Sequence, residues 1–282
     1  MATARGPRFA DLGVRLVSAL LLGPVAVAAI WFGAPWFTLL VGAATAILAW
    51  EWVHLCGLRV RALPGFAVAA ALLLASLASG FGLWPSALAL LGVGTVVAWA
   101  IARGPAIRPE QARGAVWLAA GVVYIGIAGV GIIWLRDAAE SGRANVLFLV
   151  LVVWATDIGA YLAGRMIGGP KLAPAVSPNK TWAGGVGGLA VAAAVGGIAA
   201  WALAGPSGTG AAIAIALLLG VAAQAGDLLE SWVKRRFMVK DTSRLIPGHG
   251  GLLDRADGLI AAAPAAAALS LAVGEGRVLW LA

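Results

Sequence analysis

The sequence predicts an all-α fold: a polytopic integral membrane helix bundle of about nine transmembrane helices, with the N-terminus inside the cell and the C-terminus outside. Of its 282 residues, 62% are hydrophobic and only 11% are charged, whereas soluble domains carry about 25% charged residues. The apolar runs continue over roughly 20 residues without alternation, which is typical of membrane-spanning helices and not of barrel strands. The basic residues also gather on one side of these runs. We therefore expect a single membrane domain over residues 1–282.

The apolar runs follow a short basic N-terminal segment and are separated by Gly, Pro and charged residues. The first run is long, and Gly23-Pro24 interrupts it without a clear small-residue cleavage site, so we expect a retained helix rather than a cleaved signal peptide. The chain contains 39 glycines, which suit close approach between helices in a bilayer. The nine expected spans are 14–33, 36–56, 64–83, 85–101, 115–135, 145–165, 184–204, 209–227 and 258–274.

The loop charges indicate how this bundle is oriented. If the N-terminus is inside, 17 of the 20 Lys and Arg residues lie in inside segments and three lie in outside segments. The outer turns at 33–35, 80–85 and 205–210 contain no charge. This asymmetry follows the positive-inside rule. It predicts a multi-pass protein of the inner or plasma membrane whose polar loops face the cytoplasm.

The charge balance limits the expected binding partners, and the cysteine count limits the expected disulfides and metal sites. A net charge of +8 is compatible with nucleic acid as a partner. In a membrane protein it is better explained by positive-inside loops and by contacts with anionic membrane lipids, so we expect no nucleic acid. The one cysteine, Cys56, excludes an internal disulfide and a thiolate metal cluster.

Three ionisable residues interrupt the apolar runs, where charged groups are costly and mark functional sites by default. Glu51 and His54 lie one helical turn apart near the inner end of the second span. One turn apart on a helix, they could pair, and they either take part in a site or form a snorkelled pair at the interface. Asp157 lies within the sixth span. We expect it to face an internal polar cavity, because exposure to lipid would be very unfavourable.

The two halves of the chain are expected to differ in role, because only the C-terminal half carries polar motifs. The helices of residues 1–135 are predicted to form a scaffold and are candidates for contacts in a homodimer. The helices of residues 136–282 are predicted to be catalytic, with cytoplasmic loops at 165–183 and 227–257.

The first of these loops contains residue types that bind phosphate. Ser177-Pro178-Asn179-Lys180-Thr181 combines hydroxyls with a cation, and Gly168 and Gly169 precede Lys171. Accessible backbone N–H groups and point charges are what an oxyanion needs. The spacing is not that of a Walker A loop. A simple Pro/Gly connector between two helices is the alternative interpretation.

The second loop gathers the charge of an otherwise apolar chain. Residues 227–257 hold five of the twelve carboxylates and six of the twenty basic residues. Asp227 and Glu230 share one helical face, as do Asp254 and Asp257, so two helix ends present acids toward one another. Oxygen ligands without Cys or paired His suit Mg²⁺. With nearby cations to neutralise phosphate, this pattern predicts metal-assisted phosphoryl or nucleotidyl transfer at a membrane surface, whereas an ordinary basic loop explains only the Lys and Arg.

This loop resembles a known family signature over 27 residues. The pattern is that of the CdsA-type phosphatidate cytidylyltransferases (CDP-diacylglycerol synthases), and the upstream segment around Asp157, Ser177 and Lys180 is similar to that family too. Two positions depart from the family pattern, Ala256 and Ala183. The matching residues are Ser231, Lys234, Arg235, Lys240, Asp241, Pro247, His249, Gly250, Gly251, Asp254, Arg255 and Asp257.

The resemblance implies a reaction between CTP and phosphatidate that yields CDP-diacylglycerol and diphosphate. It implies Mg²⁺, alone or with a second monovalent or divalent cation. The metal ligands that it implies are Asp227, Asp254 and Asp257, with Glu230 as a further choice. The catalytic residues that it implies are Asp227, Asp254, Lys234, Lys240 and Asp241. The substrate-binding residues that it implies are Ser177, Lys180, Ser231, Arg235, His249 and Arg255.

Two roles stay open at this point. His249 either contacts the nucleotide or orients the turn around it, and Asp241 either orients Lys240 or reaches the metal. The lipid substrate is open as well, because a polyprenyl-type phosphate would meet the same unspecific apolar surface. A transporter with broken helices would explain Asp157 and the glycine content, but it would not explain residues 227–257.

Overall fold

The structure is a computed structural model, which describes residues 23–57, 63–104, 114–138, 141–243, 245, 250–274 and 276–281. Among these residues, eight helices are long and apolar enough to cross a membrane, and a shorter apolar helix covers Gly23–Phe32. The all-α polytopic bundle is therefore confirmed; the predicted first span, 14–33, lies partly outside the described residues. The long helices are α2 (Trp36–Leu55), α3 (Leu63–Gly80), α4 (Trp84–Ala102), α6 (Ala115–Asp137), α7 (Gly142–Met166), α8 (Trp182–Ala204), α9 (Thr209–Arg236) and α10 (Leu253–Val273).

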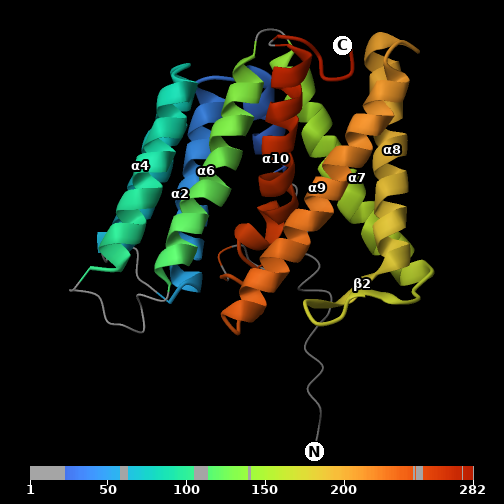
Figure 1. Cartoon of the computed structure of the whole chain (residues 1–282). Helices are drawn as coiled ribbons and strands as arrows, with labels where there is room; N and C mark the ends of the chain where they lie inside the picture. Colours follow the sequence, from blue (N-terminus) through green and yellow to red (C-terminus); the bar gives the residue numbers. More distant parts are fainter. Residues whose placement is uncertain are drawn as a thin grey trace, which may run out of the picture.

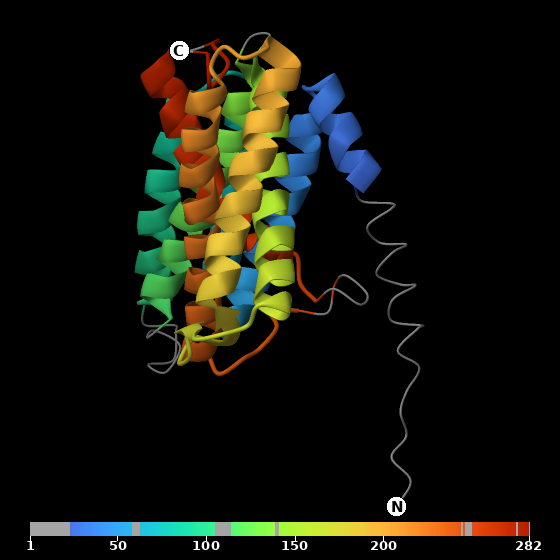
Figure 2. The ribbon, with the colours of Figure 1, turned by 90° about the vertical axis from the view of Figure 1, so that its right-hand side faces the viewer.

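The long helices stand side by side in one bundle, with α4 at one flank and α8 at the other (Figure 1). Turning the molecule shows α8 running along α7 over most of its length (Figure 2). Gly187 permits this approach, because a Cβ there would collide with Ala163 of α7. Such small-residue contacts replace the hydrophobic effect, which does not drive association between helices in lipid.

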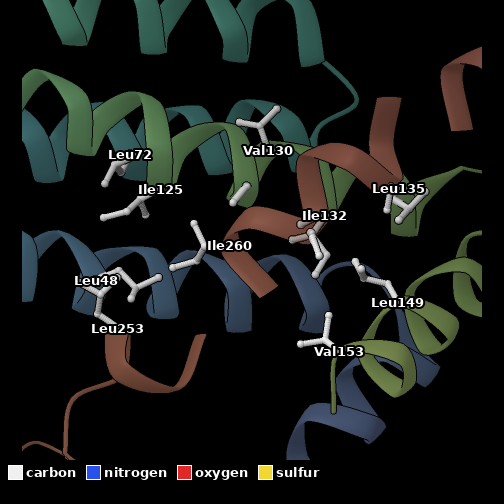
Figure 3. Close-up of a cluster of buried hydrophobic side chains, with 14 of the residues drawn as sticks. Leu48, Leu72, Ile125, Val130, Ile132, Leu135, Leu149, Val153, Leu253 and Ile260 are labelled. Carbon is white, nitrogen blue, oxygen red and sulfur yellow. The ribbon is translucent and has the colours of Figure 1, made fainter. Parts of the chain in front are cut away.

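The apolar core lies where α2, α3, α6, α7 and α10 meet. Helix α6 runs through the centre of this core. In its most apolar stretch 61% of the residues are buried, the largest share among the membrane-spanning helices. Figure 3 shows Leu72 and Ile125 beside each other, with Leu48 near Leu253 and Ile260 between the two groups. Leu253 opens α10 and is fully buried. The core therefore fixes the starting point of α10.

Helices α9 and α10 cross at two glycines. Gly226 of α9 leaves so little room that an added Cβ would lie 2.5 Å from Ala261 Cβ and 2.6 Å from the Asp257 carbonyl oxygen. Gly258 of α10 faces Ala223 at an ordinary van der Waals separation of 3.4 Å. This crossing brings the backbone next to Asp227 against the backbone of Asp257.

Both helices extend beyond the apolar runs 209–227 and 258–274, which confirms the two acid-bearing helix ends expected from the spacing of the carboxylates. Helix α9 continues to Arg236, beyond the expected end at 227, and α10 begins at Leu253 rather than at 258. The polar segment 227–257 is therefore mostly helical, and only its middle is a loop. Hydropathy alone ends α9 too early because this helix continues past its apolar run. In the continuation Glu230 and Val233 are buried and Arg235 is exposed.

The first polar segment also differs from expectation. Within 165–183 the chain forms a two-stranded antiparallel sheet from β1 (Lys171–Ala173) and β2 (Ser177–Thr181). The Thr181 side chain then caps α8 by accepting a hydrogen bond from Gly184 N (3.1 Å). Such a bond satisfies one of the unpaired N–H groups at a helix start. This hairpin lies at the end of the bundle opposite the C-terminal segment (Figure 1).

We predict that Gly226→Ala destabilises the bundle, because the new methyl group must displace backbone of α10. The expected loss is about 1–3 kcal/mol, the usual cost of overpacking. Thermal unfolding of the purified protein in detergent measures it. The matched control is Gly258→Ala, which meets only ordinary contacts and should leave the melting temperature unchanged or slightly higher, since alanine favours helix. Equal effects of the two substitutions would contradict the assigned crossing.

Candidate active site

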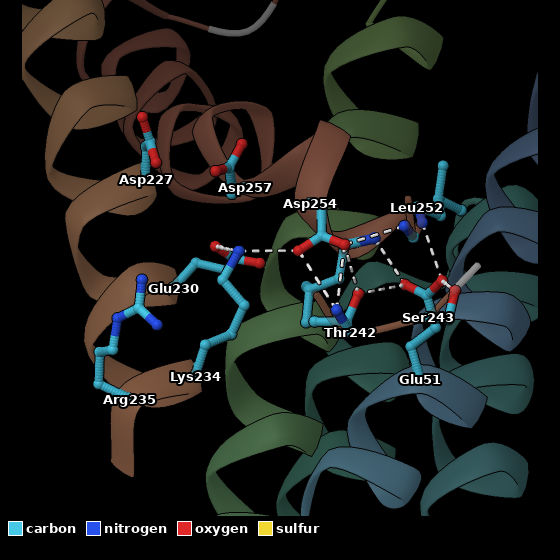
Figure 4. Close-up of polar contacts among 12 residues, drawn as sticks. Glu51, Asp227, Glu230, Lys234, Arg235, Thr242, Ser243, Leu252, Asp254 and Asp257 are labelled. Carbon is cyan, nitrogen blue, oxygen red and sulfur yellow. Dashed lines mark hydrogen bonds and ion pairs between the residues drawn. The ribbon is translucent and has the colours of Figure 1, made fainter. Parts of the chain in front are cut away.

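Three carboxylates converge where α9 crosses α10. Asp227 and Glu230 lie one turn apart on α9, and Asp257 projects from the first turns of α10 (Figure 4). One oxygen from each of the three residues lies within 4.8 Å of the others. Glu230 is buried, and the other two are half-buried. Like charges so close together need cations between or beside them.

Two lysines supply positive charge to these acids. The Lys180 Nζ lies 2.6 Å from Asp227 Oδ2, and the Lys234 Nζ lies 2.6 Å from Glu230 Oε2. Lys180 comes from β2, so this ion pair holds the hairpin against α9. A second link is the hydrogen bond from Arg235 Nε to the Val176 carbonyl, at 3.3 Å.

Asp254 lies beside the three acids and has its own set of donors. Lys234 Nζ donates to its Oδ1 at 2.7 Å, so that one ammonium group bridges Glu230 and Asp254. The other oxygen, Oδ2, accepts from Gly251 N at 2.9 Å, from Thr242 Oγ1 at 3.0 Å and from Thr242 N at 3.1 Å. This carboxylate is thus fixed in place by the loop that precedes α10.

The structure brings together most of the residues that the sequence singled out, with one change in grouping. The carboxylates that converge are Asp227, Glu230 and Asp257, whereas Asp254 is outside this group and lies beside Glu230, with which it shares the Lys234 ammonium group. The remaining candidates lie at the same end of the bundle: Ser177 and Ser231 half-buried, and Arg235, Lys240, Asp241 and Arg255 exposed. His249 and Pro247 lie outside the described residues.

Asp157 is exposed on α7, and its electrostatic neighbours are Asp227, Lys180 and Arg255. That Asp157 faces an internal polar cavity stays a prediction.

Glu51 is a site residue that sequence reasoning placed wrongly. Its side chain is fully buried and accepts hydrogen bonds from Ser243 Oγ and from the backbone of Leu252 and Leu253. The exposed His54 instead donates from Nδ1 to the Trp50 carbonyl, at 2.7 Å. Both the pairing with His54 and a snorkelled position for Glu51 are therefore wrong. An acid within an apolar helix was a sign that Glu51 has a polar partner. The sequence did not identify that partner, because the backbone donors lie about 200 positions further along the chain.

The three converging acids fit a hard divalent cation. Their donor set consists of oxygens only, which is the preference of Mg²⁺. Glu230 Oε1 is buried and has no hydrogen-bond partner among the described residues. A buried oxygen without a partner is costly, and a bound cation would satisfy it. Lys180 and Lys234 flank the acids and leave this oxygen free.

Comparison with known proteins assigns the chain to a family. The sequence profile of the Cytidylyltransferase family matches residues 13–273. The chain belongs to this family. Among family members named phosphatidate cytidylyltransferase, that of Brucella suis biovar 1 is 43% identical over 255 residues, which cover 90% of this chain and 91% of the relative. The relative from Pseudomonas aeruginosa is 36% identical over 278 residues, covering 93% and 98%. That from Staphylococcus saprophyticus is 41% identical over 152 residues, covering 51% and 55%.

We predict that Glu230→Gln weakens binding of Mn²⁺, used as a paramagnetic substitute for Mg²⁺, more than Asp254→Asn does. Loss of a direct ligand should cost at least the 10–100-fold in affinity that is typical even of outer groups at metal sites. Titration followed by electron paramagnetic resonance measures it on purified protein without substrate. Asp254→Asn serves as the matched control, since it also removes one carboxylate beside Lys234. A larger loss for Asp254→Asn would assign the metal to Asp254 instead.

Proposed function

We propose that this member of the family is a phosphatidate cytidylyltransferase, which converts CTP and phosphatidate into CDP-diacylglycerol and diphosphate. The observation that carries the proposal is the cluster of acids and lysines at the ends of α9 and α10 in an apolar bundle. A water-soluble nucleotide and a membrane-bound phosphate can meet at such a place. Close relatives that bear the same activity in their names support the substrate assignment.

The chemistry needs no side-chain nucleophile. A phosphate oxygen of phosphatidate attacks the α-phosphorus of CTP, and the bond between that phosphorus and the oxygen bridging to the β-phosphorus breaks. Diphosphate leaves with the electron pair, and a phosphate monoester is largely deprotonated near pH 7, so no base is required. The task of the protein is to position the two substrates and to balance their charge.

The described side chains fit these tasks. Asp227, Glu230 and Asp257 would hold Mg²⁺, which supplies charge neutralisation for the nucleotide phosphates. Lys180 and Lys234 would stabilise negative charge that develops on the phosphates. The family resemblance further implies Ser177, Ser231, Arg235, His249 and Arg255 as contacts to substrate, Lys240 and Asp241 as catalytic residues, and Asp254 as a catalytic residue and metal ligand. The proposal also extends to a second bound cation and to a homodimer.

The proposed site faces the cytoplasm. The described basic residues assigned to the inside lie at the end of the bundle that holds the acids, and Arg136, Arg143 and Arg277 belong to the other end. The positive-inside rule then turns the acid-bearing end toward the cytoplasm of the plasma or inner membrane, where CTP is available.

We predict that purified protein transfers label from [α-³²P]CTP to a chloroform-soluble product when phosphatidate and Mg²⁺ are present. Asp227→Asn should lower the rate by about 100-fold or more, since removing one group that stabilises transition-state charge has that order of effect. Asp137→Asn, an exposed acid at the opposite end of the bundle, is the control and should retain full activity. Labelling only with a polyprenyl phosphate would shift the substrate to another lipid, and no labelling with any lipid phosphate would end the proposal.

We also predict opposite labelling of two engineered cysteines in membrane vesicles. Ala175→Cys lies on the exposed turn of the hairpin, and Ser207→Cys lies on an exposed turn at the other end. A membrane-impermeant maleimide should react with the first in inside-out vesicles and with the second in right-side-out vesicles. The native Cys56 is buried and gives little background. The reverse pattern would contradict a cytoplasmic site.

A further inference from the structure

We propose that Glu51 is a positioning residue, which holds the loop before α10 so that Asp254 and Lys234 keep their places beside the acid cluster. Glu51 belongs to α2, far from the motifs of the C-terminal half, and it does not touch the three converging acids. Its effect on the site would pass through the loop residues Thr242 and Ser243. The inference deepens the proposed function and, for its activity measurements, rests on it.

The contacts of Glu51 all come from one short stretch of chain. Oε1 accepts hydrogen bonds from Ser243 Oγ at 2.6 Å and from Leu252 N at 2.8 Å. Oε2 accepts from Leu253 N at 2.6 Å; Thr242 Oγ1 lies 3.5 Å from Oε2, but its single hydroxyl hydrogen points to Asp254 Oδ2 at 3.0 Å. The side chain is fully buried. Within the part of the chain that the structure describes, no cation pairs with Glu51. Hydroxyl and backbone N–H donors therefore stabilise the negative charge of its carboxylate.

A carboxylate suits this position for two reasons. The first N–H groups of a helix have no partner within the helix, and Leu252 and Leu253 stand at the start of α10. The N-terminus of a helix also carries partial positive charge, which attracts an anion. Gly251 lets the acid come this close, because a Cβ there would lie 2.7 Å from Glu51 Oε1. Glu51 therefore acts as an N-terminal cap supplied by a different helix.

A series of contacts connects this cap to the acid cluster, starting from Ser243, which donates to Glu51 and directly follows Thr242 in the loop. Thr242 lies between Glu51 and Asp254, with its backbone N–H and its hydroxyl both donating to Asp254 Oδ2. Asp254 in turn holds Lys234, which pairs with Glu230. Figure 4 shows the sequence of contacts from Glu51 across Thr242 and Asp254 to Lys234. Displacing the loop would thus change where the bridging ammonium group lies.

The test compares Glu51→Gln with Thr45→Val in the full-length protein. Glutamine keeps the size but places an NH₂ donor against backbone N–H donors. Thr45 is a buried residue of the same helix that contacts Ser76 and not the loop, so it controls for a general loss of packing. Hydrogen–deuterium exchange needs no substrate, and we expect faster exchange over residues 241–258 in Glu51→Gln only.

Activity provides the second measurement. For Glu51→Gln we expect kcat to fall by about 10–100-fold, the cost of a displaced reacting group, while the KM for phosphatidate stays within about twofold because its apolar contacts are untouched. We expect the Mg²⁺ concentration for half-maximal activity to rise at least about threefold, as for disturbed outer groups of a metal site, and Glu51→Asp to recover part of both losses. A uniform loss of folded enzyme would not move that midpoint.

Equal exchange in Glu51→Gln and Thr45→Val over residues 241–258, or an unchanged Mg²⁺ midpoint, would overturn the positioning role. Absence of activity in the unmodified protein would overturn the proposed function instead, and the exchange result would still decide the role of Glu51 in holding the loop.

Discussion

Compensation of clustered negative charge is the constraint on which this structure depends. Asp227, Glu230 and Asp257 lie at the ends of membrane helices, where carboxylates repel one another and are poorly solvated. Lys180 and Lys234 offset that repulsion, and each also joins two segments: Lys180 ties the hairpin to α9, and Lys234 ties α9 to Asp254 on α10. The same pairs that make the cluster tolerable therefore assemble the walls of the site. A divalent cation would add to this compensation, not replace it.

Close backbone packing makes such charge pairing possible. The crossing at Gly226 lets α9 and α10 approach closely enough for Asp227 and Asp257 to share one space. The rigid core around α6 fixes the other side of α10 through buried Leu253 and Ile260. Small residues thus determine where the acids lie, although none of them takes part in the chemistry. This division of labour explains why a chain with so many glycines and alanines still holds polar groups in defined positions.

Much of this arrangement was predictable from the sequence, and the remainder depended on long-range contacts. The bundle followed from continuous apolar runs, and Asp227 and Asp257 stood out because acids are rare in such a chain. The family resemblance favoured Asp254 as a ligand and Glu230 as a further choice, whereas Glu230 lies among the converging acids; spacing puts both acids of each helix on one face and cannot say which of them meets the other helix. The hairpin was missed because Pro and Gly are equally typical of a plain connector. Glu51 was misassigned because its partners, Leu252 and Leu253, are distant in sequence.

The hydrogen bonds from Leu252 and Leu253 to Glu51 also bear on the order in which the protein can be assembled. Glu51 and Leu252 are separated by 201 positions, so at a synthesis rate of about 5–20 residues per second the acid waits ~10–40 s for its donors. During that time the carboxylate of Glu51 on α2 lacks the backbone donors that it has in the complete bundle. When α10 arrives, the same turn that supplies donors to Glu51 also brings Asp254 and Asp257 to the site.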